Sequence, residues 1–500
     1  MKYHIITFGC QMNKSDSERI AGLFLSLGWQ KTVTITEADL IVINTCSVRQ
    51  AAENRVFGQR DNFLALKKKN PRLRIAVTGC MPGRDKNGVL RKKTPWVDFW
   101  FPIKDLPKLP SFLSLRGVPP QTGRRGNPIN DKIATVQWSS DLAMTEYKDY
   151  FHIKPSYPNK FQAFVPIQTG CNFFCAYCVV PFARGPEQSR PLKEILREIR
   201  ALAKNGCLEI TLLGQTVNNY TAPDPENFSP KNPYKNPPCI PLSKRGNEGD
   251  FAALLWEVNQ ISGLRRINFT APYPILMTDE VIDALCLPKQ MNYLHLPVQS
   301  GDNAILKKMN RRYTAQDYLA IVKKIHAKRP DIALGTDIIV GFCGETKKQF
   351  ENTVKLYKKA DFDISYHAMY SQRSGTLAAK KFKDSVTPKE KKRRWMVLQK
   401  LMEKTTLRKN QKYVGKTVEV LVEKRKDGFC LGNSREMKLV RFKIPHNSPI
   451  SPFQKGGLRG IFKGEAGGFV GKIVKIKITQ AKTWVLEGVP LSDKPPHHAS

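Results

Sequence analysis

Long apolar runs are missing from this 500-residue sequence. No stretch of 18 residues is apolar enough to cross a bilayer, and the first residues carry no apolar run like that of a secretory signal peptide. We therefore expect a cytoplasmic protein with no membrane partner. In that reducing compartment its eleven cysteines would be ligands or buried thiols rather than disulfides.

Acidic residues are also scarce, because 43 Asp and Glu stand against 82 Lys and Arg. The formal net charge of +39 indicates a polyanionic partner. Nucleic acid is the first candidate, and an anionic membrane surface is the second. The hydrophobic fraction of 41% is that of an ordinary globular protein.

Three cysteines near the middle of the chain, Cys171, Cys175 and Cys178, have the spacing C-x3-C-x2-C. Three thiolates do not complete a structural zinc site, which takes four ligands. They can hold three irons of a [4Fe-4S] cluster and leave the fourth iron open to a small molecule. The alternative is three unrelated cysteines in one loop.

A second trio, Cys10, Cys46 and Cys80, lies in residues 1–115, where apolar runs alternate with helical patterns. This alternation predicts an N-terminal α/β domain with a parallel sheet. Each cysteine follows a predicted strand, and ligands bind at the carboxyl edge of such sheets. Spacing alone leaves both a shared site and three separate cysteines open. The predicted strands are residues 3–8, 40–44 and 74–78, and the predicted helices are residues 15–27, from a capping box, and 51–66.

Six apolar runs, most of them separated by helical patterns, occupy residues 155–385. This order predicts a partial (β/α)6 barrel with its site at the C-terminal ends of the strands. The cysteine loop follows the first run and would lie at that end. The runs are residues 163–168, 208–213, 266–269, 294–298, 333–341 and 364–370, and two clear helices are residues 191–205 and 315–328.

Short alternating strands follow a predicted basic helix at residues 389–409. Within residues 410–490 they predict a small β-barrel, whose basic residues suit the RNA backbone. The alternative is a structural lid on the larger barrel. Residues 221–250 and 446–468 are rich in proline and glycine and lack periodicity, so we expect disordered inserts. Basic arms that contact RNA are the other interpretation of these inserts.

The C-x3-C-x2-C motif is the signature of radical S-adenosylmethionine enzymes, and the chain further resembles their methylthiotransferase family. The resemblance rests on the N-terminal trio, on the segments Gly9–Asn13 and Asn44–Cys46, and on the β-rich tail, which looks like a TRAM domain. It is strongest to the tRNA branch, which thiomethylates N6-isopentenyladenosine beside the anticodon. The chain departs from the family pattern at Ala271–Pro274, Cys343 and Ser374.

The resemblance implies two [4Fe-4S] clusters, an auxiliary one on Cys10, Cys46 and Cys80 and one for S-adenosylmethionine on Cys171, Cys175 and Cys178. Reductive cleavage of that cofactor would give a 5′-deoxyadenosyl radical that takes hydrogen from C2 of the adenine. The auxiliary cluster would supply the methylated sulfur, and a second S-adenosylmethionine its methyl group. The residues expected to bind polar groups of S-adenosylmethionine are Gln215, Asn218, Gln299 and Asp337.

Three further polar residues, Asn13, Asn44 and Arg49, would lie near the auxiliary cluster, and His295 is expected to be a packed barrel residue. The implied partners are the anticodon stem-loop of tRNA and an electron donor such as a flavodoxin or ferredoxin, and the enzyme is expected to be a monomer. One rival is the same chemistry on threonylcarbamoyladenosine in tRNA or on an aspartate of a ribosomal protein. Another is an RNA-binding iron–sulfur redox sensor without catalysis.

Overall fold

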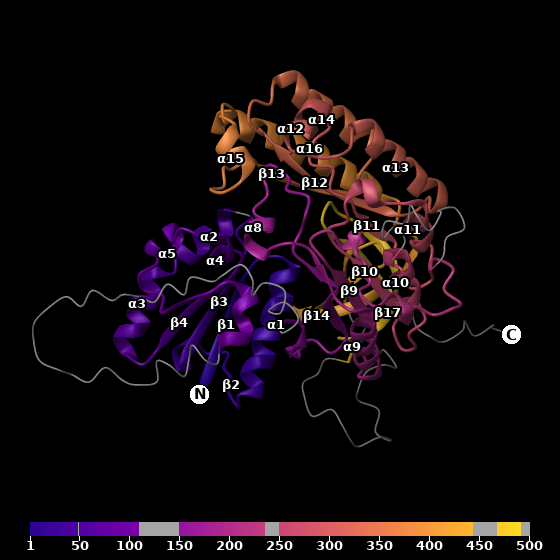
Figure 1. Ribbon diagram of the computed structural model, residues 1–500. Coiled ribbons are helices and arrows are strands. Elements are labelled where there is room, and N and C mark those ends of the chain that lie inside the picture. The colour runs from indigo at the N-terminus through magenta and orange to yellow at the C-terminus, as the bar shows by residue number, and fades with distance from the viewer. Residues whose placement is uncertain (49, 110–149, 236–249, 444–467, 492–500) are drawn as a thin grey trace, which may run out of the picture. The chain divides into compact units, whose positions relative to one another are not determined.

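The computed structural model describes residues 1–48, 50–109, 150–235, 250–443 and 468–491, which divide into two units (Figure 1). The C-x3-C-x2-C motif is shared between them, since Cys171 and Cys178 belong to the first unit and Cys175 to the second. Among the helices in these ranges, none has the length and apolar character that crossing a bilayer requires. The first unit is Met1–Pro158, Gln168–Phe174 and Cys178–Arg190, and the second is Asn159–Ile167, Cys175–Tyr177 and Pro191–Ser500.

The first unit contains a five-stranded sheet. Its strands are β1 (Lys2–Phe8), β2 (Gln30–Lys31), β3 (Leu40–Thr45), β4 (Arg74–Gly79) and β5 (Phe99–Trp100). They pair in the order β2-β1-β3-β4-β5, and every pair is parallel, which confirms the predicted N-terminal sheet. The helices are α1 (Gln11–Ser26), η1 (Ile35–Glu37), α2 (Gln50–Phe57), α3 (Arg60–Lys69), α4 (Cys80–Arg84), α5 (Val89–Lys92), η2 (Ile103–Lys108) and α8 (Val180–Arg184).

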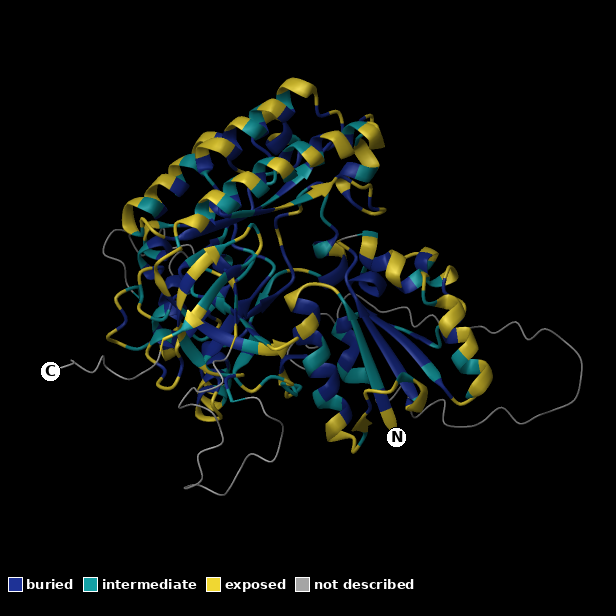
Figure 2. Ribbon diagram, turned by 180° about the vertical axis from the view of Figure 1, so that it is seen from behind, coloured by how far each residue is buried: buried dark blue, intermediate teal, exposed yellow. Residues whose placement is uncertain are grey.

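The core of this unit lies on both faces of the sheet, because successive side chains of a strand point to opposite sides. Leu40 and Val42 of β3 pack with side chains from α1, whereas Ile41 and Ile43 pack with side chains from α2 and α3. In Figure 2 the central strands are accordingly dark blue, and the helices carry exposed positions on their outer sides.

Two predicted helices of this unit have the wrong bounds. The helix expected from Ser15 begins at Gln11, because Cys10 and Asn13 form the capping box and Ser15 is buried inside the helix. The helix expected over residues 51–66 is divided into α2 and α3 at Gly58 and Gln59. A glycine is among the poorest helix formers, which explains the break.

Six parallel strands of the second unit form the predicted partial (β/α)6 barrel. They are β6 (Gln162–Pro166), β9 (Glu209–Leu213), β10 (Arg266–Phe269), β11 (Tyr293–His295), β12 (Ala333–Val340) and β13 (Ile364–Met369). They form two three-stranded sheets, β10-β9-β6 and β11-β12-β13. An isolated parallel bridge pairs Ile267 of β10 with Gln290, three residues before β11, so the strands follow one another in chain order.

Helices and short turns connect these strands. The predicted helix over residues 315–328 is confirmed by α13, and the one over residues 191–205 by α9. The connecting elements are α9 (Leu192–Lys204), η4 (Val217–Asn219), η5 (Pro225–Asn227), α10 (Asp250–Asn259), η7 (Pro274–Leu276), α11 (Asp279–Ala284), α12 (Asn303–Lys308), α13 (Ala315–Lys328), α14 (Lys347–Ala360) and α15 (Leu377–Lys381).

The C-terminal part of the second unit is a small closed β-barrel, as predicted, that follows the long helix α16 (Pro388–Gln411). Its strands are joined in the order β14-β15-β16-β18-β17. Along β17, exposed Lys475 and Lys477 alternate with buried Ile476 and Ile478, which is the pattern of a half-buried strand. The strands are β14 (Thr417–Lys426), β15 (Phe429–Ser434), β16 (Leu439–Lys443), β17 (Ile473–Ala481) and β18 (Leu486–Pro490).

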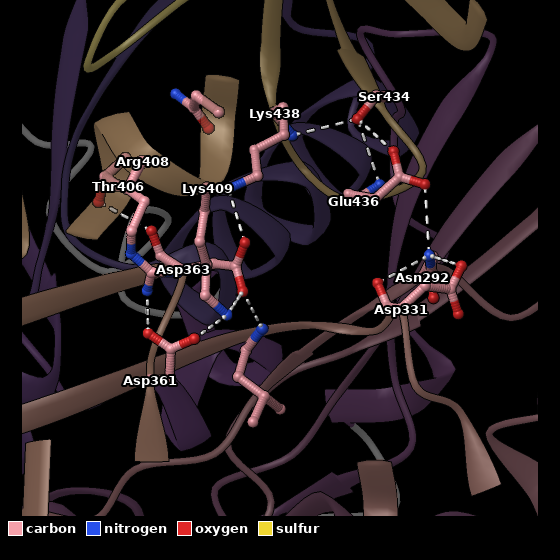
Figure 3. A network of polar contacts seen from close by, with 12 residues as sticks. Asn292, Asp331, Asp361, Asp363, Thr406, Arg408, Lys409, Ser434, Glu436 and Lys438 are labelled. Carbon is pink, nitrogen blue, oxygen red and sulfur yellow. Dashed lines mark hydrogen bonds and ion pairs between the residues drawn. The ribbon is translucent and has the colours of Figure 1, made fainter. Parts of the chain in front are cut away.

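A buried carboxylate, Asp363, attaches this small barrel to the rest of the unit (Figure 3). It accepts an ion-paired hydrogen bond from Lys438 of the small barrel at 2.9 Å and from Lys409 of α16 at 3.0 Å. Burial alone would raise the pKa of Asp363, but these two ammonium groups hold it below its ordinary value. The small barrel therefore has one defined position against the six-stranded barrel within this unit.

The two predicted inserts are only partly described. Residues 236–249 and 444–467 lie outside the described residues, and so does Cys239. Residues 221–235 are described, and there the expectation of disorder is wrong. Phe228 is buried, and the amide of Asn232 donates to the buried carboxylate of Glu257 at 3.0 Å. One aromatic ring and one buried acceptor anchor a segment whose overall composition is typical of a loop.

Candidate functional site

The three N-terminal cysteines leave the sheet at one edge. In the register of the sheet, Phe8 of β1 pairs with Thr45 of β3, which pairs with Gly79 of β4. Cys10, Cys46 and Cys80 follow these residues within two positions. Parallel strands present their carboxyl ends on the same side, so the register brings together three thiols that are far apart in sequence.

Two buried amides hold the first of these thiols in place. The backbone N–H of Cys10 donates to Asn13 Oδ1 at 3.3 Å, and its thiol lies 3.4 Å from the same oxygen. The Asn13 side chain donates to Asn44 Oδ1 at 3.0 Å, and Asn44 Nδ2 donates to the Asn13 carbonyl at 2.7 Å. These asparagines tie the start of α1 to β3, whereas Arg49 lies outside the described residues.

Gly79 permits the close approach of β3 and β4 beside Cys80. Its φ of 98° is in the region that favours glycine, and a Cβ there would lie 2.5 Å from the Thr45 carbonyl oxygen. The thiol of Cys46 accepts a hydrogen bond from the Val48 N–H at 3.3 Å. Two buried thiols, one of which accepts from a backbone N–H, and one exposed thiol are a donor set that fits an iron–sulfur cluster.

Arg184, six residues after Cys178, lies close to Cys80. Its guanidinium forms a buried ion pair with Asp16 of α1 at 2.5 Å, and the Tyr150 hydroxyl donates to the other carboxylate oxygen at 2.5 Å. Burial raises the pKa of the Cys80 thiol, while the nearby Arg184 lowers it. Burial and the Asp16 charge both raise the pKa of Tyr150. No local sequence signal indicates these roles, because the partners are 134 and 168 positions apart in the chain.

Helix α8, which carries Arg184, also contacts the helix that begins at Cys80. A Cβ on Gly83 of α4 would lie 2.1 Å from the carbonyl oxygen of Ala183, so the two backbones touch. The segment after the second cysteine trio therefore lies directly against the segment after the first. Both belong to the first unit.

The loop that bears Cys171 is closed on itself. The short strands β7 (Gln168–Thr169) and β8 (Gln188–Ser189) pair antiparallel at its base. Above them, the Cys171 N–H donates to the Gly185 carbonyl at 3.2 Å. Gln168 is fully buried, and neither side-chain amide atom has a hydrogen-bond partner among the described residues. An orphaned amide three residues before Cys171 fits a site that a bound group completes.

Cys175, the middle cysteine of the motif, is held in the second unit by backbone hydrogen bonds of its neighbour. The Ala176 N–H donates to the Met309 carbonyl at 2.9 Å, and the Ala176 carbonyl accepts from the Ala378 N–H at 2.8 Å. The Cys175 thiol accepts a hydrogen bond from Arg311 Nη1 at 3.4 Å. No spacing or composition signal pointed to Arg311.

The four residues expected to bind S-adenosylmethionine differ in whether their side chains already have hydrogen-bond partners within the protein. Both ends of the Asn218 amide are bound to the backbone of Tyr273, at 2.7 and 3.0 Å, so this side chain joins two loops of the barrel. Gln215 Oε1 is buried and has no hydrogen-bond partner in the described part of the chain, which leaves it available to a ligand.

The other two, Gln299 and Asp337, are neighbours, although Asp337 lies inside β12 and not at its end. The Gln299 N–H donates to the Asp337 carbonyl at 2.9 Å, and Gln299 has a φ of 67°. The Asp337 carboxylate lies 3.1 Å from His295 Nε2, whose ring also contacts the Tyr293 hydroxyl at 3.2 Å. The structure therefore brings these two residues together, and His295 is partly buried between polar partners.

The remaining described cysteines stand apart from both trios. Cys207, Cys343 and Cys430 are buried, and Cys286 is exposed. Across the described ranges, no group of three or more His, Cys, Asp or Glu side chains is arranged around a single metal ion. In a [4Fe-4S] cluster three thiolates bind three different irons.

Family models match two parts of the chain. The radical SAM superfamily model matches residues 165–357, and the model of the uncharacterized protein family UPF0004 matches residues 2–102. Similarity to solved structures is slight. TsrM of Kitasatospora setae, a radical S-adenosylmethionine methyltransferase, is 14% identical, with a TM-score of 0.47 over 76% of this chain and 75% of that one.

Curated relatives match almost the whole chain. The tRNA-2-methylthio-N(6)-dimethylallyladenosine synthase of Bacillus velezensis is 39% identical over 98% of this chain and 85% of that protein. The synthase of the same name from Caldicellulosiruptor saccharolyticus is 41% identical over 88% of this chain and 86% of its own length. That of Bacillus subtilis is 38% identical over 97% and 85%. The chain therefore belongs to the radical S-adenosylmethionine methylthiotransferases, enzymes that use S-adenosylmethionine and [4Fe-4S] clusters, in the family of these tRNA-modifying synthases.

Proposed function

We propose that this enzyme adds a methylthio group to C2 of N6-dimethylallyladenosine, the residue beside the anticodon of tRNA. The observation that carries the proposal is the contact of α4 with α8, because it places the helix that starts at Cys80 against the segment that follows Cys178. The names of the relatives, over nearly the full chain, support the choice of substrate.

The two cysteine trios have separate roles in this proposal. Cys10, Cys46 and Cys80 hold the auxiliary cluster, and Cys171, Cys175 and Cys178 hold the cluster that binds S-adenosylmethionine. When bound, these groups supply the one-electron chemistry and the sulfur that side chains lack. Activation of an aromatic C–H bond needs such chemistry, since no side chain can remove that hydrogen as a proton.

The chain itself holds and orients these groups. Asn13 and Asn44 fix the position of Cys10, and Arg184 with Asp16 keeps α8 against α1. Gln215, Gln299 and Asp337 are proposed to bind polar groups of S-adenosylmethionine, and Asn218 shapes their surroundings. The residues that do this positioning, Asn13, Asn44, Asp16 and Arg184, are all buried, which limits their freedom to move.

The RNA is proposed to bind the small barrel of residues 410–490, the TRAM-like domain. Lys475 and Lys477 are exposed on β17, and Trp484, nearby in the chain, is 50% exposed. Lysines can contact phosphates of any sequence, and an aromatic ring can stack on an unpaired base. Residues 1–115 and 155–385 are the proposed auxiliary-cluster and radical S-adenosylmethionine domains.

The proposal also includes the compartment, the oligomeric state and the electron donor. The enzyme works in the cytoplasm as a monomer, with a flavodoxin or ferredoxin as electron donor. The anticodon loop suits this chemistry, because its bases are unpaired and can be presented singly.

The test is mass spectrometry of tRNA nucleosides from a host that lacks the gene and from the same host carrying it. Only the second host should contain the 2-methylthio derivative of N6-dimethylallyladenosine, and the first should accumulate the unmodified precursor. A methylthio group on threonylcarbamoyladenosine would instead assign the substrate to that rival branch. If the tRNA nucleosides of the two hosts are the same, mass spectrometry of ribosomal proteins tests the aspartate branch.

A further inference from the structure

Arg311 is a charged residue of the second unit that contacts Cys175, the cysteine of the central motif in that unit. Its Nη1 donates to the Cys175 thiol at 3.4 Å. Arg311 follows α12, and it is separated from Cys175 by 136 positions in the sequence. A guanidinium is protonated at every pH at which proteins are folded, so this contact places a permanent positive charge beside the sulfur.

Two tyrosines hold the guanidinium in place. The Tyr273 ring centre lies 4.2 Å from the guanidinium carbon, and the Tyr313 ring centre lies at 4.9 Å. Arg311 Nε donates to the Tyr313 hydroxyl at 2.9 Å, and that hydroxyl in turn donates to the Val298 carbonyl at 3.0 Å. Both rings are within the range of a cation–π interaction.

Tyr273, whose ring is the nearer of the two to the guanidinium, is held by hydrogen bonds at its backbone and at its hydroxyl. Its backbone N–H donates to Asn218 Oδ1 at 2.7 Å, and its hydroxyl accepts from the Arg312 N–H at 3.0 Å. Tyr273 is 4% exposed and Tyr313 is 5% exposed. Little freedom is left for Arg311 to swing away from Cys175, and this rigidity distinguishes it from a lysine or arginine on the surface.

We propose that Arg311 is a positioning residue that raises the reduction potential of the cluster held by Cys175, with Tyr273 as the ring that fixes its guanidinium. The proposal rests on the proposed function of Cys175 as a cluster ligand. Reduction adds one electron to the cluster, so a fixed cation at a ligand sulfur stabilises the reduced state more than the oxidised state. Hydrogen bonds to the sulfurs and nearby charge are known determinants of such potentials.

The alternative is that Arg311 binds the carboxylate of S-adenosylmethionine. Its contacts disfavour that role, because Nε is bound to Tyr313, Nη1 to Cys175 and Nη2 to the Pro297 carbonyl at 3.4 Å. A guanidinium oriented by three partners that it already has is poorly placed to form a two-pronged contact with a ligand.

The experiment compares reduction potentials in the full-length chain carrying Cys10→Ala, Cys46→Ala and Cys80→Ala, so that a single cluster contributes to the signal. After anaerobic reconstitution, iron is counted and the potential is measured by a redox titration followed by electron paramagnetic resonance, without S-adenosylmethionine. We expect Arg311→Gln to make reduction about tenfold less favourable, a shift of about 59 mV to lower potential. Arg311→Lys should recover part of the shift.

The matched control is Arg312→Gln, which removes the same charge from the next, exposed position and should leave the potential unchanged. Tyr273→Leu should lower the potential while keeping Arg311, since the guanidinium loses the ring that fixes it. This variant also covers the case in which Arg311→Gln fails to load iron.

Equal potentials in the parent, Arg311→Gln and Tyr273→Leu would overturn the proposal, and so would a lower affinity for S-adenosylmethionine in Arg311→Gln without any shift. Absence of iron from the parent protein itself would contradict the proposed ligand role of Cys175 instead. The two failures are therefore distinguishable.

Discussion

The Arg184 guanidinium lies 2.5 Å from the Asp16 carboxylate, and both side chains are almost fully buried. The two residues are 168 positions apart, yet the pair joins α1, which begins beside Cys10, to α8, which follows Cys178. One ion pair thus links a segment next to one cysteine of each trio within the first unit. The structure also has Tyr150 donating to the same carboxylate.

Replacing Asp16 with Asn should strongly destabilise the first unit. The guanidinium of Arg184 would stay buried without its counter-charge, and loss of one partner of such a pair costs about 3–5 kcal/mol. Urea unfolding of the anaerobic protein measures this cost. Glu37→Gln is the control, because its pair with Lys2 is about half exposed and should contribute less than about 1 kcal/mol. Equal effects of the two substitutions would contradict the structural role assigned to Asp16.

Cysteine variants should separate the two clusters by activity and by iron content. Cys175→Ala should abolish formation of 5′-deoxyadenosine. Cys46→Ala should leave that product but stop methylthio transfer, and the iron content should fall from about eight to about four per chain. Cys286→Ala, at an exposed cysteine outside both trios, should change neither quantity. Methylthio transfer by Cys46→Ala would show that the N-terminal trio has another role.

Gly79→Ala should reduce both stability and iron loading. The added Cβ would lie 2.5 Å from the Thr45 carbonyl oxygen in a backbone with a φ of 98°, so β3 and β4 would have to separate beside Cys80. We expect a loss of more than about 2 kcal/mol, from clash and backbone strain together. Gly88→Ala is the matched control, since its φ is 68° and nothing lies within 4 Å of the new Cβ. If the two variants load iron equally well, the close approach at Gly79 is unimportant.

The partly buried His367 of β13 should make the second unit sensitive to mild acid. Burial lowers the pKa of His367 to about 4, although the Asp337 charge acts in the opposite direction. In the unfolded chain a histidine titrates near pH 6.5, so the folded state binds fewer protons between these values. The stabilising effect is complete above about pH 6.5 and is lost as the pH falls toward 4.

The check is urea unfolding of the wild type and of His367→Gln at several pH values between 7 and 4.5. The free energy of unfolding of the wild type should fall across this range by up to about 3 kcal/mol, and that of the variant by clearly less. Parallel curves for the two proteins would assign the acid sensitivity to other groups.

The sequence by itself determined the order and type of most elements and the identity of both cysteine trios. Residues 315–328 form the expected helix, and the six expected strands form one partial barrel. Both could be predicted because the spacing of apolar residues along the chain indicates whether a segment buries one face as a helix or as a strand. The C-x3-C-x2-C spacing likewise needs no tertiary information, since three nearby thiols can reach one cluster.

Only the tertiary structure decided which distant residues meet. The register of β1, β3 and β4 brings Cys10, Cys46 and Cys80 to one edge, and packing pairs Arg184 with Asp16 and Arg311 with Cys175. Such pairs leave no periodic signal, because a buried charge needs a partner in space and not at a fixed distance along the chain. The ordered residues 221–235 have the same explanation, since burial of Phe228 outweighs a composition typical of disorder.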